Sequence, residues 1–120
     1  MTIAAVFMAV GGSIVVAVGR AAQRGMLSPN AWAGIRTPAT TASTEAWYAA
    51  HQAGGRWIAI GGWIIAIGGV ILLLVRPDDT DAARIALFTV GVGAAVVVYG
   101  GFLGHQAAED LADSGETSLS

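Results

Sequence analysis

Three long apolar runs, separated by polar stretches, dominate the hydrophobic pattern of the chain. The runs cover residues 3–19, 57–75 and 85–103, and none contains an Asp, Glu, Lys, Arg or His. As helices, the first two would reach about 26 and 28 Å at 1.5 Å per residue. That is close to the thickness of about 30 Å of a bilayer hydrocarbon core. The pattern therefore predicts an all-α membrane protein with three transmembrane helices.

Turn-forming residues mark the ends of these runs. Gly25 and Pro29 follow the first run, Pro77 closes the second, and Asp78 or Thr80 is placed to cap the third. A signal peptide is an alternative for the first run. Because no Lys or Arg precedes it and no convincing cleavage site follows it, we predict a retained helix.

The amino-acid composition further limits the class of protein. Hydrophobic residues make up 55% of the 120 residues and charged residues 12%, whereas soluble domains carry about 25% charged residues. The net charge of -2 supplies no basic field for nucleic acid, and the absence of Cys excludes disulfides and thiolate chemistry. We predict a single membrane domain over residues 1–112, with helix continuing over 105–112, and a disordered polar tail over 113–120.

The distribution of arginines predicts how the chain is oriented. The first loop carries four arginines, and the short acidic link carries Arg76 and Arg84 beside three Asp. Positively charged loops stay in the cytoplasm. We therefore expect a bacterial cell-membrane protein with its N-terminus outside and with the first loop and C-terminus cytoplasmic.

Glycine pairs occur within or beside the apolar runs, at positions 11–12, 61–62, 68–69 and 100–101. Lipid supplies no hydrophobic drive between helices, so small residues that allow close backbone approach drive their association. Gly100 with Gly104, and Gly62 with Ala66, have the four-residue spacing of such contacts. The pattern predicts packing among the three helices, with a homodimer through the Gly-rich faces as an alternative.

The longest polar interval before the acidic tail is the stretch 30–51. Pro38 disfavours helix in the residue before it, and Ser43 is a good N-cap with Glu45 in the following turn. This predicts a short helix through residue 53, lying along the membrane interface and bending at 54–55 into the second span. On it, Trp47 and His51 share a face.

The same stretch carries an ordered motif made of Asn30, Gly34, Ile35, Arg36, Thr37, Pro38, Thr40, Ser43, Glu45, Trp47 and His51. This motif resembles the signature loop of the SdpI family, a segment that lies between two membrane helices. The resemblance extends more loosely to about residue 103, and Ala39 stands where the family often has an aromatic residue. It implies a membrane protein of the immunity or signalling type, with a toxin peptide or a repressor as partner and no established catalytic residues.

Several of these residues admit both structural and functional interpretations. Arg36 either contacts an anion, a lipid headgroup or a partner protein, or binds loop carbonyls and holds the loop together. Trp47 is expected to be an interfacial anchor rather than a ligand platform, and Glu45 a helix-start charge rather than a general base. A metal site formed by His51, His105, Glu45 and Glu109 is a remote alternative, because their spacing matches no ligand pattern.

Two hypotheses about function follow. The first is an SdpI-like binding protein in the lipid bilayer, acting in immunity against a toxin peptide or in membrane signalling. The second is an accessory subunit that packs against a larger membrane protein complex. The uncharged spans argue against an ion pathway, and no nucleophile–base pair or metal motif points to an enzyme, so we expect neither catalysis nor a cofactor.

Overall fold

The computed structural model consists of three long helices and describes residues 1–119, with side chains described to residue 114. Helix α1 spans Thr2–Gln23, α2 spans Thr44–Val75 and α3 spans Asp79–Leu119. Each is long and apolar enough to cross a membrane. This confirms the predicted all-α membrane fold with three spans.

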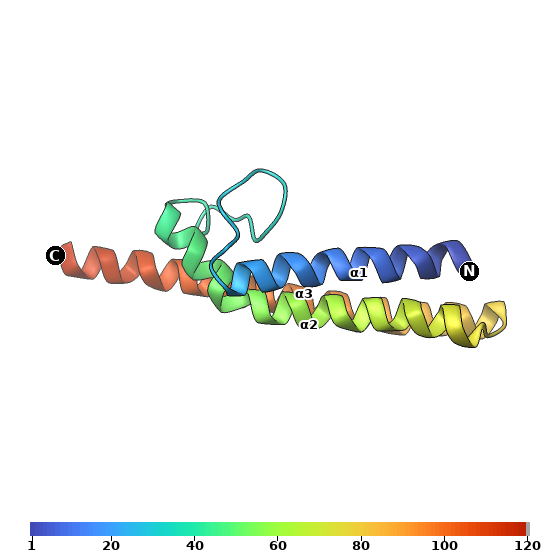
Figure 1. Cartoon of the computed structure of the whole chain (residues 1–120). Helices are drawn as coiled ribbons and strands as arrows, with labels where there is room; N and C mark the ends of the chain where they lie inside the picture. The colour runs from blue at the N-terminus through green and yellow to red at the C-terminus, as the bar shows by residue number, and fades with distance from the viewer. Residues whose placement is uncertain (120) are drawn as a thin grey trace.

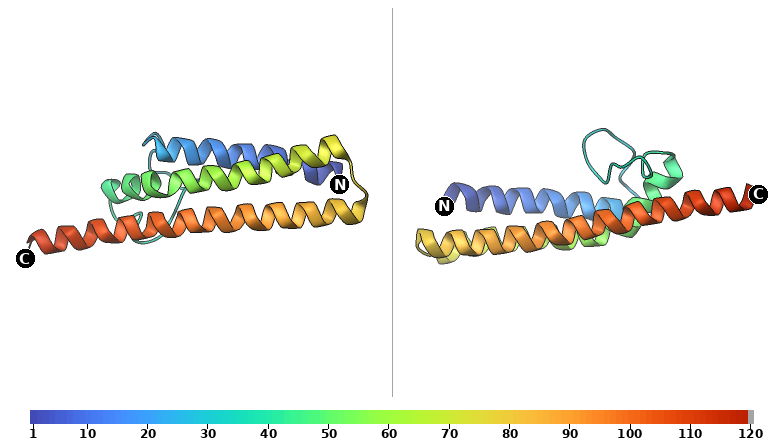
Figure 2. Two further views of the ribbon diagram at one scale, coloured as in Figure 1. Left: turned by 90° about the horizontal axis from the view of Figure 1, so that it is seen from below. Right: turned by 180° about the vertical axis from the view of Figure 1, so that it is seen from behind.

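Helix α2 lies between the other two (Figure 2) and packs along both, whereas α1 and α3 scarcely touch each other. Helix α2 runs antiparallel to α1, and α3 runs antiparallel to α2. The N-terminus therefore lies at the end that holds the α2–α3 turn, and the first loop lies at the opposite end, beside the C-terminal part of α3 (Figure 1).

Three glycine pairs in α2 explain how one helix packs closely on two sides. The pairs are 54–55, 61–62 and 68–69, seven residues apart, so they recur every two turns on the same faces. The first member of each pair faces α3: a Cβ built on Gly61 would lie 2.5 Å from the carbonyl oxygen of Gly93. The second member faces α1: a Cβ on Gly62 would lie 2.7 Å from the backbone nitrogen of Val16.

The facing helices carry matching small residues. On α1, a Cβ on Gly12 would lie 2.5 Å from the nitrogen of Ala66, and Gly19 meets Ala59 in the same way. On α3, Gly100 and Gly104 lie against the backbone of α2. The predicted packing of glycines within the chain is therefore confirmed for Gly12, Gly100 and the pairs 61–62 and 68–69, whereas a Cβ on Gly11 or Gly101 would meet nothing within 4 Å. A homodimer remains a prediction.

The turns at the helix ends follow the local sequence. After α1, Gly25 takes a φ of +71°, and the N–H of Met26 donates to the carbonyl of Ala21 at 2.8 Å, which completes a Schellman turn. After α2, Arg76 is left-handed and Pro77 prevents continuation. The N–H of Asp81 donates to the side chain of Asp78 at 2.8 Å, so Asp78 rather than Thr80 caps α3.

The short interfacial helix predicted in the first loop is not confirmed as a separate element: its residues form the first turns of α2. Residues 44–75 form one continuous helix of 32 residues, although its first turns are angled away from the remainder in Figure 1. Gly54 and Gly55, where the sequence predicted a bend, remain helical because their missing side chains let α3 and α1 approach the backbone on either side. Tertiary contact thus outweighs the low helix propensity of glycine.

Helix α3 extends far beyond the apolar run. Residues 105–112 are helical, as predicted, and Ala108 is buried against Ala46 and Ala50 of α2. The helix continues through residues 113–119, for which the sequence predicted a disordered tail; extending an existing helix adds one hydrogen bond for each residue ordered. The last residue of that tail, Ser120, and the side chain of Glu116 lie outside the described part of the chain.

Candidate functional site

The candidate site is the first loop, which follows α1, folds over the end of the helices and is held to α2 and α3. Its central residue is Ile35, whose backbone is clamped on both sides. The Ile35 N–H donates to Nε2 of His51 at 2.8 Å, and its carbonyl accepts from the Thr40 hydroxyl at 2.7 Å. The Ile35 side chain is buried and points at Gly54 of α2 and Gly104 of α3. The loop is therefore a fixed part of the fold.

His51 is the buried polar centre of this arrangement. Its side chain is fully enclosed, and its Nδ1 lies 2.7 Å from the carbonyl oxygen of Trp47. A carbonyl oxygen only accepts, so Nδ1 carries the proton and Nε2 is free to accept from Ile35. Both ring nitrogens are thus engaged by the chain, and the imidazole is held as one neutral tautomer.

Trp47 is buried and supports the loop. The sequence-based prediction that it anchors the chain at the membrane interface is wrong. Only 2% of Trp47 is exposed. Its ring stacks on His51 with 4.1 Å between centroids, and its indole N–H donates to the carbonyl of Leu27 at 2.9 Å. The partner of the indole lies 20 residues earlier in the chain, so the burial of Trp47 depends on how the loop folds back.

Position 34 requires glycine for two reasons: its backbone conformation and the lack of space for a Cβ atom. Its φ of +116° is accessible essentially to glycine alone. A Cβ at this position would also collide with Nε2 of His51 and lie 3.2 Å from the Trp47 ring. The glycine thus permits the loop backbone to lie directly on the two stacked rings.

We expect Gly34→Ala to lower the free energy of unfolding by about 2–3 kcal/mol, because it combines backbone strain with overpacking against a fixed ring. Gly25→Ala is the matched control: Gly25 also has positive φ, but its Cβ would meet only the flexible side chain of Gln52, at 2.8 Å. Thermal unfolding in detergent measures both. Equal melting temperatures would show that contact with His51 does not set the requirement for glycine.

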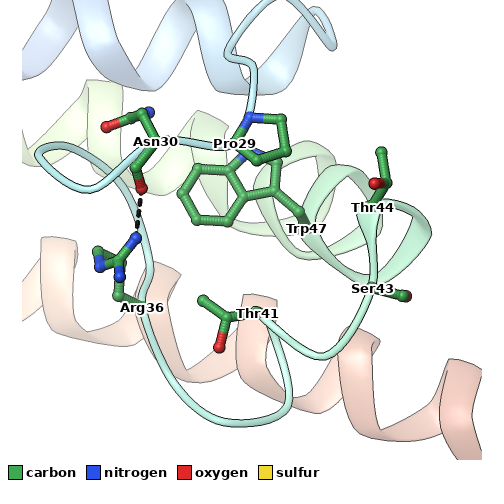
Figure 3. Close-up of a pocket in the computed structure, with 7 residues that line it drawn as sticks. All are labelled: Pro29, Asn30, Arg36, Thr41, Ser43, Thr44 and Trp47. Carbon is green, nitrogen blue, oxygen red and sulfur yellow. Dashed lines mark hydrogen bonds between the residues drawn. The ribbon is translucent and has the colours of Figure 1, made fainter.

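Asn30 and Arg36 shape the outer part of the loop. The Asn30 side-chain oxygen accepts from the N–H groups of Trp32 and Ala33, each at 2.8 Å, which forms an Asx turn. The Arg36 guanidinium donates to the Asn30 carbonyl (Figure 3). Arg36 thus makes the loop-carbonyl contact of the structural interpretation, while its side chain stays exposed at the surface.

Thr37 joins the loop to α3, and Thr40 holds Thr37 in place. The Thr40 hydroxyl accepts from the Thr37 N–H at 2.9 Å, and Thr37 Oγ1 lies 2.7 Å from Nδ1 of His105. His105 in turn contacts Glu109 at 2.8 Å through Nε2. His105 was not among the predicted loop residues, because it lies 68 positions from Thr37 and outside the motif.

The remaining predicted residues lie at the start of α2 or on the surface. Ser43 is the N-cap, as predicted, and its hydroxyl accepts from the N–H of Ala46 at 3.0 Å. Glu45 lies in the first turn of α2 and is exposed, and Pro38, also exposed, begins a turn over residues 38–41. The structure therefore brings most of the motif together but leaves Pro38 and Glu45 outside the buried cluster.

Two cavities lie beside the loop. A polar cavity of about 360 Å³ opens between the loop and the start of α2, as Figure 3 shows, and is lined by Pro29, Asn30, Arg36, Thr41, Ser43, Thr44 and Trp47. An apolar cavity of about 370 Å³ lies between α1 and α3, with Gly34 and Ile35 on its wall. Among the described residues, no group of three or more His, Cys, Asp or Glu is arranged to hold a metal ion.

Together, fold and site define a small multi-pass membrane protein whose first loop is a preformed surface clamped to the helix ends. The sequence model of the SdpI/YfhL protein family matches residues 26–103. The chain therefore belongs to the SdpI/YfhL family, and the match covers the loop and the second and third spans. Comparison with curated proteins and with solved structures finds no match to the chain.

Proposed function

We propose that the chain is a binding protein of the SdpI type, acting in immunity against a toxin peptide or in membrane signalling. One observation carries this proposal: the buried signature residues hold the loop in a single shape and leave other side chains free for contact. Trp32 is 93% exposed at the outside of the loop, and Arg36 is exposed beside the polar cavity. Tryptophan and arginine are among the residue types most enriched at binding hot spots.

The rigidity of the loop supports a recognition role. Ordering a loop on binding opposes association, so a loop already held by Trp47, His51 and Ile35 binds with less entropic cost. We propose recognition rather than catalysis, since both histidines are occupied by contacts within the chain. With the loop in the cytoplasm, as the arginine distribution predicts, a soluble partner would be a cytoplasmic protein such as a repressor. A toxin peptide would reach the loop after entering the membrane.

Deleting the gene in its own host tests the proposal. We expect the deletion strain to lose viability in conditioned medium of the same host, and the wild-type chain to restore growth. Trp32→Ala and Arg36→Gln should each lower the protection by about tenfold, the loss of roughly 1.4 kcal/mol of binding. Met26→Ala is the control, because Met26 is an exposed residue of the same loop that lines neither cavity.

Normal growth of the deletion strain in that medium would rule out immunity. Full protection by the Trp32 and Arg36 variants would show that the loop surface is not where the partner binds. The second candidate, an accessory subunit of a larger complex, predicts a stoichiometric partner after purification in mild detergent. We rank it second because the glycine faces that suggested it are used between α2 and its two neighbours.

A further inference from the structure

A cleft with two arginines on its walls lies between α1 and α2, apart from the loop cavity but at the same end of the helices. Its walls come from two helices and enclose about 180 Å³. It is lined by Arg20, Gln23, Arg56, Ala59, Ile60 and Trp63. None of these residues belongs to the signature motif or lines the loop cavity.

A close backbone contact between α1 and α2 places the two arginines at one level. A Cβ on Gly55 would lie 2.6 Å from the carbonyl oxygen of Gly19, so the two backbones touch there. Arg20 directly follows Gly19, and Arg56 directly follows Gly55. Glycine packing thus brings two positive charges to the rim of one cleft, where their repulsion favours a shared anion.

Among the side chains that the structure describes up to residue 114, no salt bridge joins a carboxylate to Arg20 or Arg56. The salt bridges of Arg84 with Asp81 and of His105 with Glu109 both lie within α3. The nearest further charge on α1 is Arg24, one turn after Arg20, and it is also positive. The guanidinium of Arg56 lies 5.0 Å from the centre of the Trp57 ring, a contact that leaves its charge unpaired.

The cleft is polar at one end and apolar at the other. Ala59, Ile60 and Trp63 follow Arg56 by about one to two turns into the apolar run, so they extend from the membrane edge toward the bilayer core. Ile60 and Trp63 are 37% and 49% exposed and face lipid. A ligand that fits this gradient has an anionic head and a hydrocarbon tail.

We propose that this cleft binds one anionic phospholipid. Arg20, Gln23 and Arg56 hold the phosphate by charge-assisted hydrogen bonds, and an acyl chain lies along Ile60 and Trp63. With the arginine-rich side in the cytoplasm, the site faces the leaflet surface where anionic lipids attract basic groups. The lipid would fasten α1 to α2 at the end where the loop begins.

Native mass spectrometry of the full chain in detergent tests the site, with phosphatidylglycerol and phosphatidylcholine of identical acyl chains as probes. We expect Arg20→Gln with Arg56→Gln to raise the apparent Kd for phosphatidylglycerol about twenty-five-fold, since each arginine contributes about a factor of five. The Kd for phosphatidylcholine should not change. The control is Arg76→Gln with Arg84→Gln, which removes the same charge at the opposite end of the helices. It should alter either Kd by less than about threefold, because charges that far apart are screened.

Three outcomes would overturn the proposal. The first is an equal loss of phosphatidylglycerol binding in both double variants, since that would show a general charge effect. The second is full competition by millimolar inorganic phosphate, which would mean that the cleft takes a free anion. The third is a lipid-free dimer that dissociates only in the Arg20 and Arg56 variant, which would make a second copy the occupant. Equal melting temperatures of the two double variants verify that both are folded.

Discussion

Gly12→Val is expected to separate α1 from α2 and to lower the free energy of unfolding in detergent by about 3 kcal/mol. The Cβ of any residue at this position meets backbone atoms of Ala66 and Gly62 at 2.5 and 2.7 Å. Backbone in the middle of a helix cannot move aside as a flexible side chain can, so the helices must move apart. Their dispersion contacts are lost over the whole seam. Thermal unfolding in detergent measures the change.

The neighbouring residue supplies the control. A Cβ on Gly11 meets nothing within 4 Å, so Gly11→Val changes the same helix by the same group without touching α2. We expect its melting temperature to stay within a few degrees of wild type, because substitutions away from packed sites usually cost less than about 0.5 kcal/mol. A similar loss in both variants would mean that valine destabilises α1 itself, and the glycine seam would not be the cause.

His51→Ala is expected to release the first loop while the chain still inserts in the membrane. The substitution removes the acceptor of the buried Ile35 N–H, at about 1–3 kcal/mol, and the stacking on Trp47, at about 0.5–1.5 kcal/mol. A total near 3 kcal/mol would speed amide exchange in the peptide containing Ile35 about 100-fold. Hydrogen-exchange mass spectrometry measures this rate.

Gln52→Ala is the matched control for this variant, since Gln52 is the next residue of α2 and is exposed. We expect its exchange rate in the same peptide to match wild type. An unchanged rate in His51→Ala would show that the Thr40 and Asn30 contacts alone hold the loop. Membrane insertion should be the same in all three proteins, because the apolar run 57–75 is unaltered.

These expectations separate two groups within the signature motif. Gly34, Thr40, Trp47 and His51 build the loop, so their variants should affect stability as well as function. Arg36 is different: it contacts a loop carbonyl and also reaches the surface. A loss of protection at unchanged stability is the result that identifies a recognition residue, and Trp32 and Arg36 are where we expect it.

The arrangement of α2 gives one helix two packing functions. Its paired glycines face α1 and α3 in turn, so both neighbours approach the same backbone closely. Such contacts suit a protein in lipid, where close van der Waals packing replaces the hydrophobic drive between helices. The lipid-facing surface is correspondingly rich in large apolar side chains, such as Ile3, Phe7, Leu74, Leu87 and Phe88.

Local chemistry was enough to predict the spans, the turns and the capping of the helices. Span length follows from the count of apolar residues, which must match the bilayer. The Ser43 cap and the end of α1 near Gly25 depend on the residue itself and a few neighbours in the chain. The signature loop was recognisable for the same reason, since its motif lies within one short continuous stretch.

Tertiary structure alone decided which contacts these residues make. Trp47 was predicted at the interface, yet it is buried because Leu27 and Gly34 fold back over it. Gly54 and Gly55, where a bend was predicted, stay within one continuous helix because α1 and α3 both pack against that backbone. The His105 contact and the cleft of Arg20 and Arg56 each join residues more than thirty positions apart. Sequence periodicity defines the faces of each helix, but which face meets which partner depends on the packing of all three helices.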